Sequence, residues 1–234
     1  MKTKSHRRIF LKRGALLGSG LWLASLVSSR ATTENPPTAE ANIWEVFKQR
    51  RSVRKFRPDA IPEKDIVKMI EAARLAPTSG NQQPWKFLVI RDPNKIRQLK
   101  EACIKAAMER FAQSSPAARP KEKEEQEKSS RAAFDNYLSA SVYIVVLTDN
   151  KSQYPDYNHW DGPLAAGYLM LAARALGYGT VHITDSIPDS VTKTVLRIPD
   201  RYTRICITPV GIPVEWPGPN QKGRLEEFLA YESV

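Results

Sequence analysis

The spacing of hydrophobic positions predicts several helices. After Pro62, the residues Ile66, Met69, Ile70 and Ala73 recur at i, i+3, i+4 and i+7, which is the spacing of one helix face. This helix is expected to end near Ala76, because the following proline disfavours helical geometry in the residue before it. Similar spacing predicts a helix that begins at residue 43 and helices over 94–113 and 161–177, the last with a glycine cap at 177.

Short apolar runs bounded by polar residues predict buried strands. They cover residues 85–90, 141–149, 180–184 and 204–211. Helices and strands are mixed without a strict βαβ rhythm, which favours an α+β fold, with a central mixed or antiparallel sheet flanked by helices. The most polar stretch, 114–130, is interpreted either as a disordered loop or as the start of a solvated helix.

The first 31 residues interrupt this pattern. "SHRRIFLKRG" at 5–14 resembles the twin-arginine export signal, and the apolar run 14–27 is shorter than the roughly 20 residues of a membrane-spanning helix. Small residues around Ala31 suggest a cleavage site, with cleavage after Ala41 as the alternative. We expect a signal peptide over 1–31, a polar linker over 32–41 and a folded domain over 42–234. The predicted location is periplasmic; the alternatives are cytoplasmic or tethered to the membrane by an uncleaved signal.

The signal segment also explains most of the positive charge. The whole chain has a net charge of +11, but residues 1–31 hold seven basic residues and no acidic one. The remainder therefore carries only +4, which argues against a nucleic-acid partner. Cys103 and Cys206 lie in apolar stretches and are interpreted as core residues, with a single bridge between them as the alternative. Two cysteines and three histidines make a protein-built zinc site improbable on composition.

Three polar stretches are candidates for binding chemistry. In "RRSVRKF" at 50–56, Arg50, Ser52 and Arg54 share one face of an extended chain and could clamp a phosphate. "APTSGNQQPW" at 76–85 joins a helix to a strand and offers many hydrogen-bonding groups. "NQKGRL" at 220–225 adds a late basic pair. Taken singly, the first stretch could equally be a solvated basic turn, and the second and third are more simply explained as a connecting loop and an exposed tail.

Together, the first two stretches resemble the nitroreductase family of FMN-dependent oxidoreductases. "RRSVRKF", a helix ending in "AARLAP", and "SGNQQPW" before a strand stand in the family's order and spacing. The resemblance covers roughly residues 43–234 and implies an interlocked homodimer with two FMN molecules at its interface. Residue by residue, it implies that FMN is contacted by Arg50, Arg51, Ser52, Arg54, Thr78, Ser79, Asn81, Gln83, Thr184, Lys222 and Arg224. Asp185 departs from the glycine often found at its place.

The resemblance also implies the reaction. The flavin would carry out ping-pong transfer of hydride or electrons from NAD(P)H or another donor to a nitroaromatic, a quinone or a related small acceptor. No side chain is required as a nucleophile or base. FMN made in the cytoplasm would explain why the chain should fold before export. Alternatives are a non-catalytic flavin-binding protein, or different flavin chemistry such as reductive dehalogenation or flavin destruction.

Substrate specificity would depend on lid segments, for which 108–140 and 153–161 are the candidates. Their aromatic residues could stack on a substrate or pack internally: Phe111, Phe134, Tyr137, Tyr154, Tyr157 and Trp160.

Overall fold

The computed structural model describes residues 43–233 of the 234-residue chain. These residues fall within one compact unit, Ala39–Val234. The predicted signal segment 1–31 and linker 32–41 lie outside the described residues. Within residues 43–233, no helix has both the length and the apolar character needed to cross a membrane.

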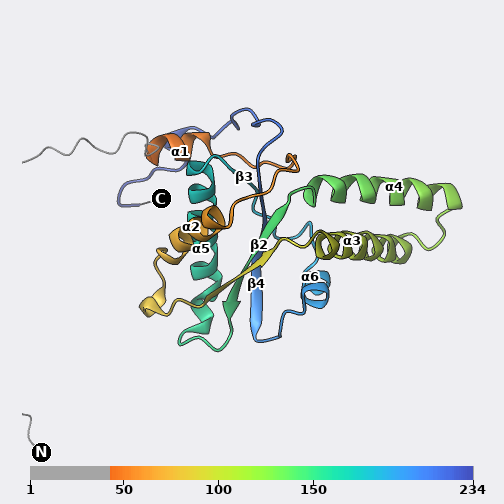
Figure 1. Cartoon of the computed structure of the whole chain (residues 1–234), viewed down its shortest axis with the longest axis horizontal. Coiled ribbons are helices and arrows are strands. Elements are labelled where there is room, and N and C mark those ends of the chain that lie inside the picture. Colours follow the sequence, from red (N-terminus) through yellow and green to blue (C-terminus); the bar gives the residue numbers. More distant parts are fainter. Residues whose placement is uncertain (1–42, 234) are drawn as a thin grey trace, which may run out of the picture. The chain divides into compact units, whose positions relative to one another are not determined.

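The centre of the unit is a four-stranded antiparallel sheet in the order β1-β2-β4-β3 (Figure 1). Its strands are β1 (Trp85–Ile90), β2 (Val142–Asp149), β4 (Tyr202–Gly211) and the two-residue β3 (Gly179–Thr180). In the register, Phe87 of β1 lies opposite Val146 of β2, and Val145 lies opposite Ile207 of β4. The α+β prediction is confirmed, and every strand pairing is antiparallel rather than mixed.

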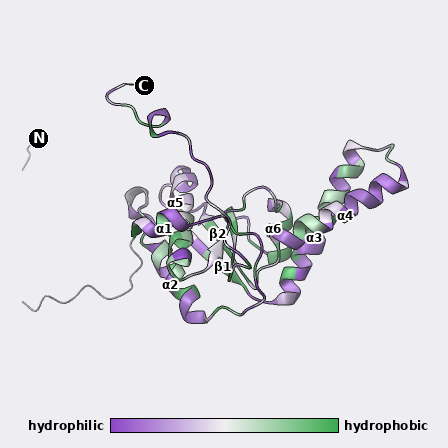
Figure 2. Ribbon diagram, turned by 90° about the horizontal axis from the view of Figure 1, so that it is seen from above, coloured by the Kyte–Doolittle hydropathy of each residue, from purple (hydrophilic) through white to green (hydrophobic). Residues whose placement is uncertain are grey.

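Helices cover both faces of the sheet, as both ribbon views show (Figures 1 and 2). One side carries α1 (Ile43–Gln49), α2 (Glu63–Arg74) and α5 (Asn158–Ala175). The other carries α3 (Pro93–Ser114), α4 (Pro120–Tyr137) and α6 (Asp189–Leu196). Strand β2 alternates between the two cores: Val145 packs in the α3 side and Ile144 in the α5 side. This double burial explains why β2 appears in the sequence as a continuous apolar run.

The predicted strand 180–184 is shorter in the structure. Beyond Thr180, the chain keeps the register of β4, but it returns to β4 only at Ile183, which exchanges two backbone hydrogen bonds of 3.2 and 3.0 Å with Ile207. Val181 and Ile183 are buried, as their apolar character predicted. Between Thr180 and Ile183, however, the segment does not pair with β4 as a regular strand.

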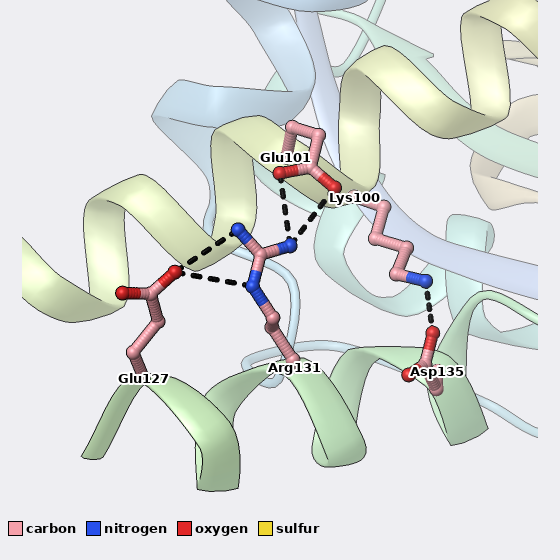
Figure 3. A network of polar contacts seen from close by, with 5 residues as sticks. All are labelled: Lys100, Glu101, Glu127, Arg131 and Asp135. Atoms are coloured by element: carbon pink, nitrogen blue, oxygen red, sulfur yellow. Dashed lines mark hydrogen bonds and ion pairs between the residues drawn. The ribbon is translucent and has the colours of Figure 1, made fainter. Parts of the chain in front are cut away.

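The polar stretch 114–130 is mostly helical, so the loop interpretation was wrong. Helix α4 begins at Pro120, where the Glu122 carboxylate accepts the Arg119 backbone N–H at 2.8 Å. Figure 3 shows how polar side chains tie α4 to α3: Arg131 bridges Glu127 and Glu101 at 3.0 and 3.2 Å. Short three-residue helices, η1 (Ser79–Asn81), η2 (Pro155–Tyr157) and η3 (Leu225–Glu227), complete the described elements, and α6 had not been predicted.

Both cysteines are core residues, as predicted. Cys103 and Cys206 are fully buried, and each is a free thiol, so the alternative bridge does not form. Burial raises the pKa of Cys103 to about 12 and that of Cys206 to about 11.

Candidate functional site

The first candidate segment, residues 50–56, leaves α1 and runs in extended form along β3. Ser52 forms a parallel bridge with Thr180, and the Val53 N–H donates to the Thr180 carbonyl at 2.9 Å. Val53 and Phe56 are buried and anchor the segment in the core. On an extended chain Ser52 and Arg54 lie on the face opposite Val53; Ser52 is half-buried and Arg54 is exposed.

The cations of this segment are not equivalent. The Arg51 guanidinium donates to the carbonyls of Lys48 and Gly218, so it closes the end of α1 and holds the C-terminal tail. Among the described residues, the Arg50 guanidinium and the Ser52 hydroxyl have no hydrogen-bond or ion-pair partner. Arg50 and Ser52 are therefore the groups left available for an anion. Arg51, which the resemblance assigns to FMN, is engaged within the protein.

The tail meets the same segment in a cleft of about 260 Å³. Its walls are formed by residues 51–55 and by Glu215, Pro217 and Asn220. Lys222 and Arg224 follow just beyond Asn220. Arg224 pairs with Glu227 at 3.4 Å, and within the described chain no hydrogen bond or ion pair joins Lys222 or Arg224 to residues 50–54.

The second candidate segment is the tight loop before β1. Gly80, Asn81 and Gln83 have positive φ angles of 56°, 55° and 48°. Thr78 Oγ1 accepts the Gln83 N–H at 3.2 Å, so this hydroxyl closes the loop. Asn81 and Gln83 are exposed, and their side chains bond to each other at 3.2 Å. Non-glycine residues in the left-handed region are strained, and such strain gathers at functional sites.

A buried carboxylate secures this loop to the start of α5. Asp161, only 2% exposed, accepts the Ser79 N–H at 3.1 Å and the Gln82 side-chain amide at 2.7 Å. Sequence reasoning missed both Asp161 and Gln82. The available signal was an acidic residue in the otherwise apolar stretch 161–173, which indicates a buried polar partner.

Thr184, which only the family resemblance suggested, lies along the β3 edge. The Arg204 guanidinium donates to the Thr184 carbonyl at 2.7 Å and pairs with Asp189 at 3.0 Å. Its side chain is only 5% exposed, and Nη1 has no partner within the described chain. Arg204 therefore fixes the backbone of Thr184, while the Asp185 side chain remains exposed. Desolvation lowers the pKa of the neighbouring His182, which favours a neutral imidazole.

The structure places these segments on opposite edges of the sheet. The loop 78–83 leads into β1 at one edge, whereas Ser52 and Thr184 lie along β3 at the other. Strands β2 and β4 stand between β1 and β3, so the two outer strands are about 14 Å apart at the usual strand spacing. One chain therefore does not bring all the predicted FMN contacts together.

The candidate lid residues divide into two groups. Phe134 is buried in the α3 core, so its role is packing. Tyr154, Tyr157 and Trp160 are 41%, 45% and 58% exposed and form a chain of ring contacts 6.4 and 5.4 Å apart beside the loop 78–83. Within residues 43–233, no three His, Cys, Asp or Glu side chains gather as a metal site.

Comparison with known proteins identifies the family of the chain. The profile of the nitroreductase family matches residues 47–212. The chain belongs to the nitroreductase family. A relative from Archaeoglobus fulgidus, provisionally named NADH dehydrogenase/NAD(P)H nitroreductase, is 32% identical over 170 residues, covering 70% of this chain and 81% of the relative. The iodotyrosine deiodinase of Thermotoga neapolitana is 29% identical over 172 residues, or 73% and 88% of the two chains.

A solved member of this fold shows the same architecture. The crystal structure of oxidised iodotyrosine deiodinase bound to FMN and 3-iodo-L-tyrosine superposes with a TM-score of 0.64 at 22% identity. The match covers 82% of this nitroreductase-family chain and 100% of that one. At this identity, the likeness establishes the shared fold.

Proposed function

We propose that this nitroreductase-family protein is an FMN-dependent oxidoreductase in which two copies of the chain together hold each FMN. The observation that carries the proposal is the division of the site. Unpartnered Arg50 and Ser52 lie on one sheet edge, and the polar loop 78–83 lies on the other. In a dimer with twofold symmetry, the Arg50 edge of each chain would meet the 78–83 loop of the other chain. This would form two equivalent FMN sites.

The residues present fit FMN. The Arg50 guanidinium and the Ser52 hydroxyl offer donors for the phosphate, with Arg54 beside them. The Thr184 backbone, fixed by Arg204, would offer groups for the ring edge, and Asn81 and Gln83 of the second copy would supply amides for it. Bound FMN would supply the two-electron chemistry, and the chain's own groups bind and orient it. The basic pair Lys222 and Arg224 would reach the phosphate only if the tail repositions in the assembly.

Exposed apolar side chains support the homodimer. On α5, Trp160, Leu164 and Tyr168 are 58%, 44% and 40% exposed and follow one another along one face. On α1, Trp44 and Phe47 are 67% and 51% exposed. Apolar side chains gathered on the exposed face of a helix mark an interaction site. A second copy is the occupant that also completes the FMN site.

The proposed acceptors are nitroaromatic compounds, quinones and related small molecules, with NAD(P)H or another electron donor. The relative named NADH dehydrogenase/NAD(P)H nitroreductase supports this choice. The exposed rings of Tyr154, Tyr157 and Trp160 offer a stacking surface for a flat acceptor. An exported enzyme would need a donor other than NAD(P)H, such as a quinol or a partner protein.

The first experiment is an absorbance spectrum of the purified protein, with the released cofactor identified by mass and the mass of the native particle measured. Yellow protein that releases about one FMN per chain from a dimer would support the proposal. Colourless protein that takes up no added FMN would refute it.

Reductive dehalogenation is a second candidate, favoured by the match to a relative named iodotyrosine deiodinase. It would replace an aryl carbon–halogen bond by carbon–hydrogen, consuming two electrons and a proton and releasing halide. Parallel assays of the reduced protein with a nitroaromatic, a quinone and a halogenated phenol separate the two reactions. Tight FMN binding without turnover of any of them would favour the non-catalytic alternative.

We also propose that residues 1–31 direct export by the twin-arginine route to the periplasm. The support is sequence alone: the Arg7–Arg8 pair and the short apolar run that follows it. Fractionation of cells expressing the full chain, compared with a variant in which both arginines are replaced by lysine, tests the proposal. Equal cytoplasmic retention of both forms would refute it.

A further inference from the structure

The Asp161 carboxylate is buried, and the proposed function assigns it no contact with FMN or with a substrate. It lies in the first turn of α5, yet the side-chain contacts of its oxygens are with the loop 78–83 rather than with its own helix. Oδ1 accepts the Ser79 N–H at 3.1 Å, and Oδ2 accepts the Gln82 Nε2–H at 2.7 Å. Hydrogen bonds accepted by a carboxylate are stronger than those between neutral groups.

The Gln82 side chain is held from two directions. Its Oε1 accepts the Tyr154 N–H at 2.7 Å, and its Nε2 donates to the Tyr154 carbonyl at 3.0 Å as well as to Asp161. The buried Asn158 amide lies within 3.4 Å of the same nitrogen and donates to the Asp149 carbonyl at 2.9 Å. Rotation of the Gln82 amide would break all of its close bonds. Gln82 therefore joins the loop both to the α5 carboxylate and to the segment that leads into α5.

This attachment acts on a strained backbone. Residues Asn81 and Gln83, on either side of Gln82, both have left-handed φ angles. That conformation is unfavourable for residues with a Cβ, so an unattached loop would relax toward other geometries. The same two residues carry the exposed amides that the proposed function assigns to the flavin.

We infer that Asp161 and Gln82 are positioning residues, which hold the loop 78–83 in the strained conformation that presents Asn81 and Gln83 to FMN. The inference rests on the proposed function, because it concerns how the flavin-contact loop is prepared before FMN arrives. A preorganised loop binds with less loss of conformational freedom than a mobile one. Asp161 and Gln82 themselves need not touch FMN.

An exchange of the two polar groups tests the pairing. Q82E places a carboxylate against the Asp161 carboxylate, and D161N places an amide NH₂ against the Gln82 NH₂ or loses the Ser79 bond. In Q82E/D161N, the introduced carboxylate can again accept a hydrogen bond from the introduced amide. The bond to the Tyr154 carbonyl is still lost, so the rescue should be incomplete. Asp156→Asn, a nearby exposed carboxylate on η2, is the matched control.

The measurements are FMN affinity from flavin fluorescence, visible circular dichroism of bound FMN, and urea unfolding of the FMN-free protein. Each single variant should weaken FMN binding about tenfold, the size expected for one lost charge-assisted hydrogen bond. The double variant should recover affinity to within about threefold of the unchanged protein, since it restores the bond between positions 82 and 161. The Asp156→Asn control should bind FMN normally.

Hydrogen exchange supplies a readout that does not depend on FMN. In the FMN-free protein, the Ser79 amide and its loop neighbours should exchange faster in D161N and Q82E than in the control. Because Gln82 is half-buried whereas Asp161 is only 2% exposed, Q82E should disturb the core less than D161N does.

The outcomes separate the two proposals. If the unchanged protein binds no FMN, the proposed function fails, and this inference with it. If it binds FMN but the single variants keep its affinity and circular dichroism, only the inference fails. A double variant whose loss equals the sum of the two single losses would also overturn it. Reduced urea stability with unaltered FMN binding would assign the pair a purely structural role.

Discussion

Replacing Gly80 by alanine tests whether the geometry of the loop 78–83 matters for binding. Gly80 has a φ of +56°, and a Cβ built on it would lie 2.4 Å from Tyr154 Cε2. Two penalties therefore act at one position: a left-handed backbone that disfavours a side chain, and an overlap with an aromatic ring. The ring is 41% exposed, so it can move aside, but its movement disturbs the segment that Gln82 holds.

The magnitude follows from the backbone term. A residue with a Cβ in the left-handed region costs about 1–2 kcal/mol relative to glycine. If the loop keeps its shape, the free energy of unfolding falls by that amount. If the loop relaxes instead, the cost appears as weaker FMN binding, by about 5- to 30-fold. Urea unfolding and FMN titration of the same preparation together capture either outcome.

Two other glycines separate the strain from the overlap. Gly177, at the end of α5, has a φ of +87° but nothing within 4 Å of an added Cβ, so Gly177→Ala carries strain alone and should reduce stability without altering FMN binding. Gly167, inside α5, has neither feature within one chain; because it shares the α5 face proposed for the dimer, the gain of about 0.5–1 kcal/mol expected for Gly167→Ala applies to the undimerised chain. A Gly80→Ala protein that matches the unchanged protein in both stability and FMN affinity would refute the reasoning.

Three further predictions concern the rest of the fold. Phe134→Ala should cost about 3–5 kcal/mol in urea unfolding because it empties the α3–α4 core, whereas Arg131→Ala, which removes only exposed ion pairs, should cost far less; equal losses would contradict this. The Cys103 thiol, with a pKa raised to about 12 by burial, should resist a thiol reagent at pH 8 until the protein unfolds. Hydrogen bonds from Arg201 lower the pKa of Asp149 in the folded protein. The ionised carboxylate therefore stabilises the fold above the unfolded pKa of about 4, and this stabilisation is lost as pH falls through the folded pKa. In urea unfolding, Asp149→Asn should be less stable than the unchanged protein at pH 7, and the difference should shrink by pH 3.

Periodicity alone predicted the elements with strong apolar patterns. The long helix α5 and the strand β2 were found because α5 is apolar along most of its length and β2 is buried on both faces, which leaves a clear pattern in the sequence. Helix α6 was not predicted, and for the start of α4 the sequence left a disordered loop and a solvated helix both open. In α4, Ser130 and Phe134 are the buried residues of an 18-residue helix, so charged residues dominate its pattern. Its stability comes from packing on α3 and from the ion pairs of Figure 3, which no local window contains.

The sequence by itself determined the candidate binding segments, because short motifs such as "RRSVRKF" and "SGNQQPW" hold their groups within a few residues of one another. Only the tertiary structure decided how those groups are used. It engaged Arg51 at the end of α1, left Arg50 and Ser52 available, and placed the two motifs on opposite sheet edges. It also revealed Asp161, a partner 79 residues beyond Gln82 that no motif connects to it. Such pairings depend on which elements pack together, and local patterns of polarity do not carry that information.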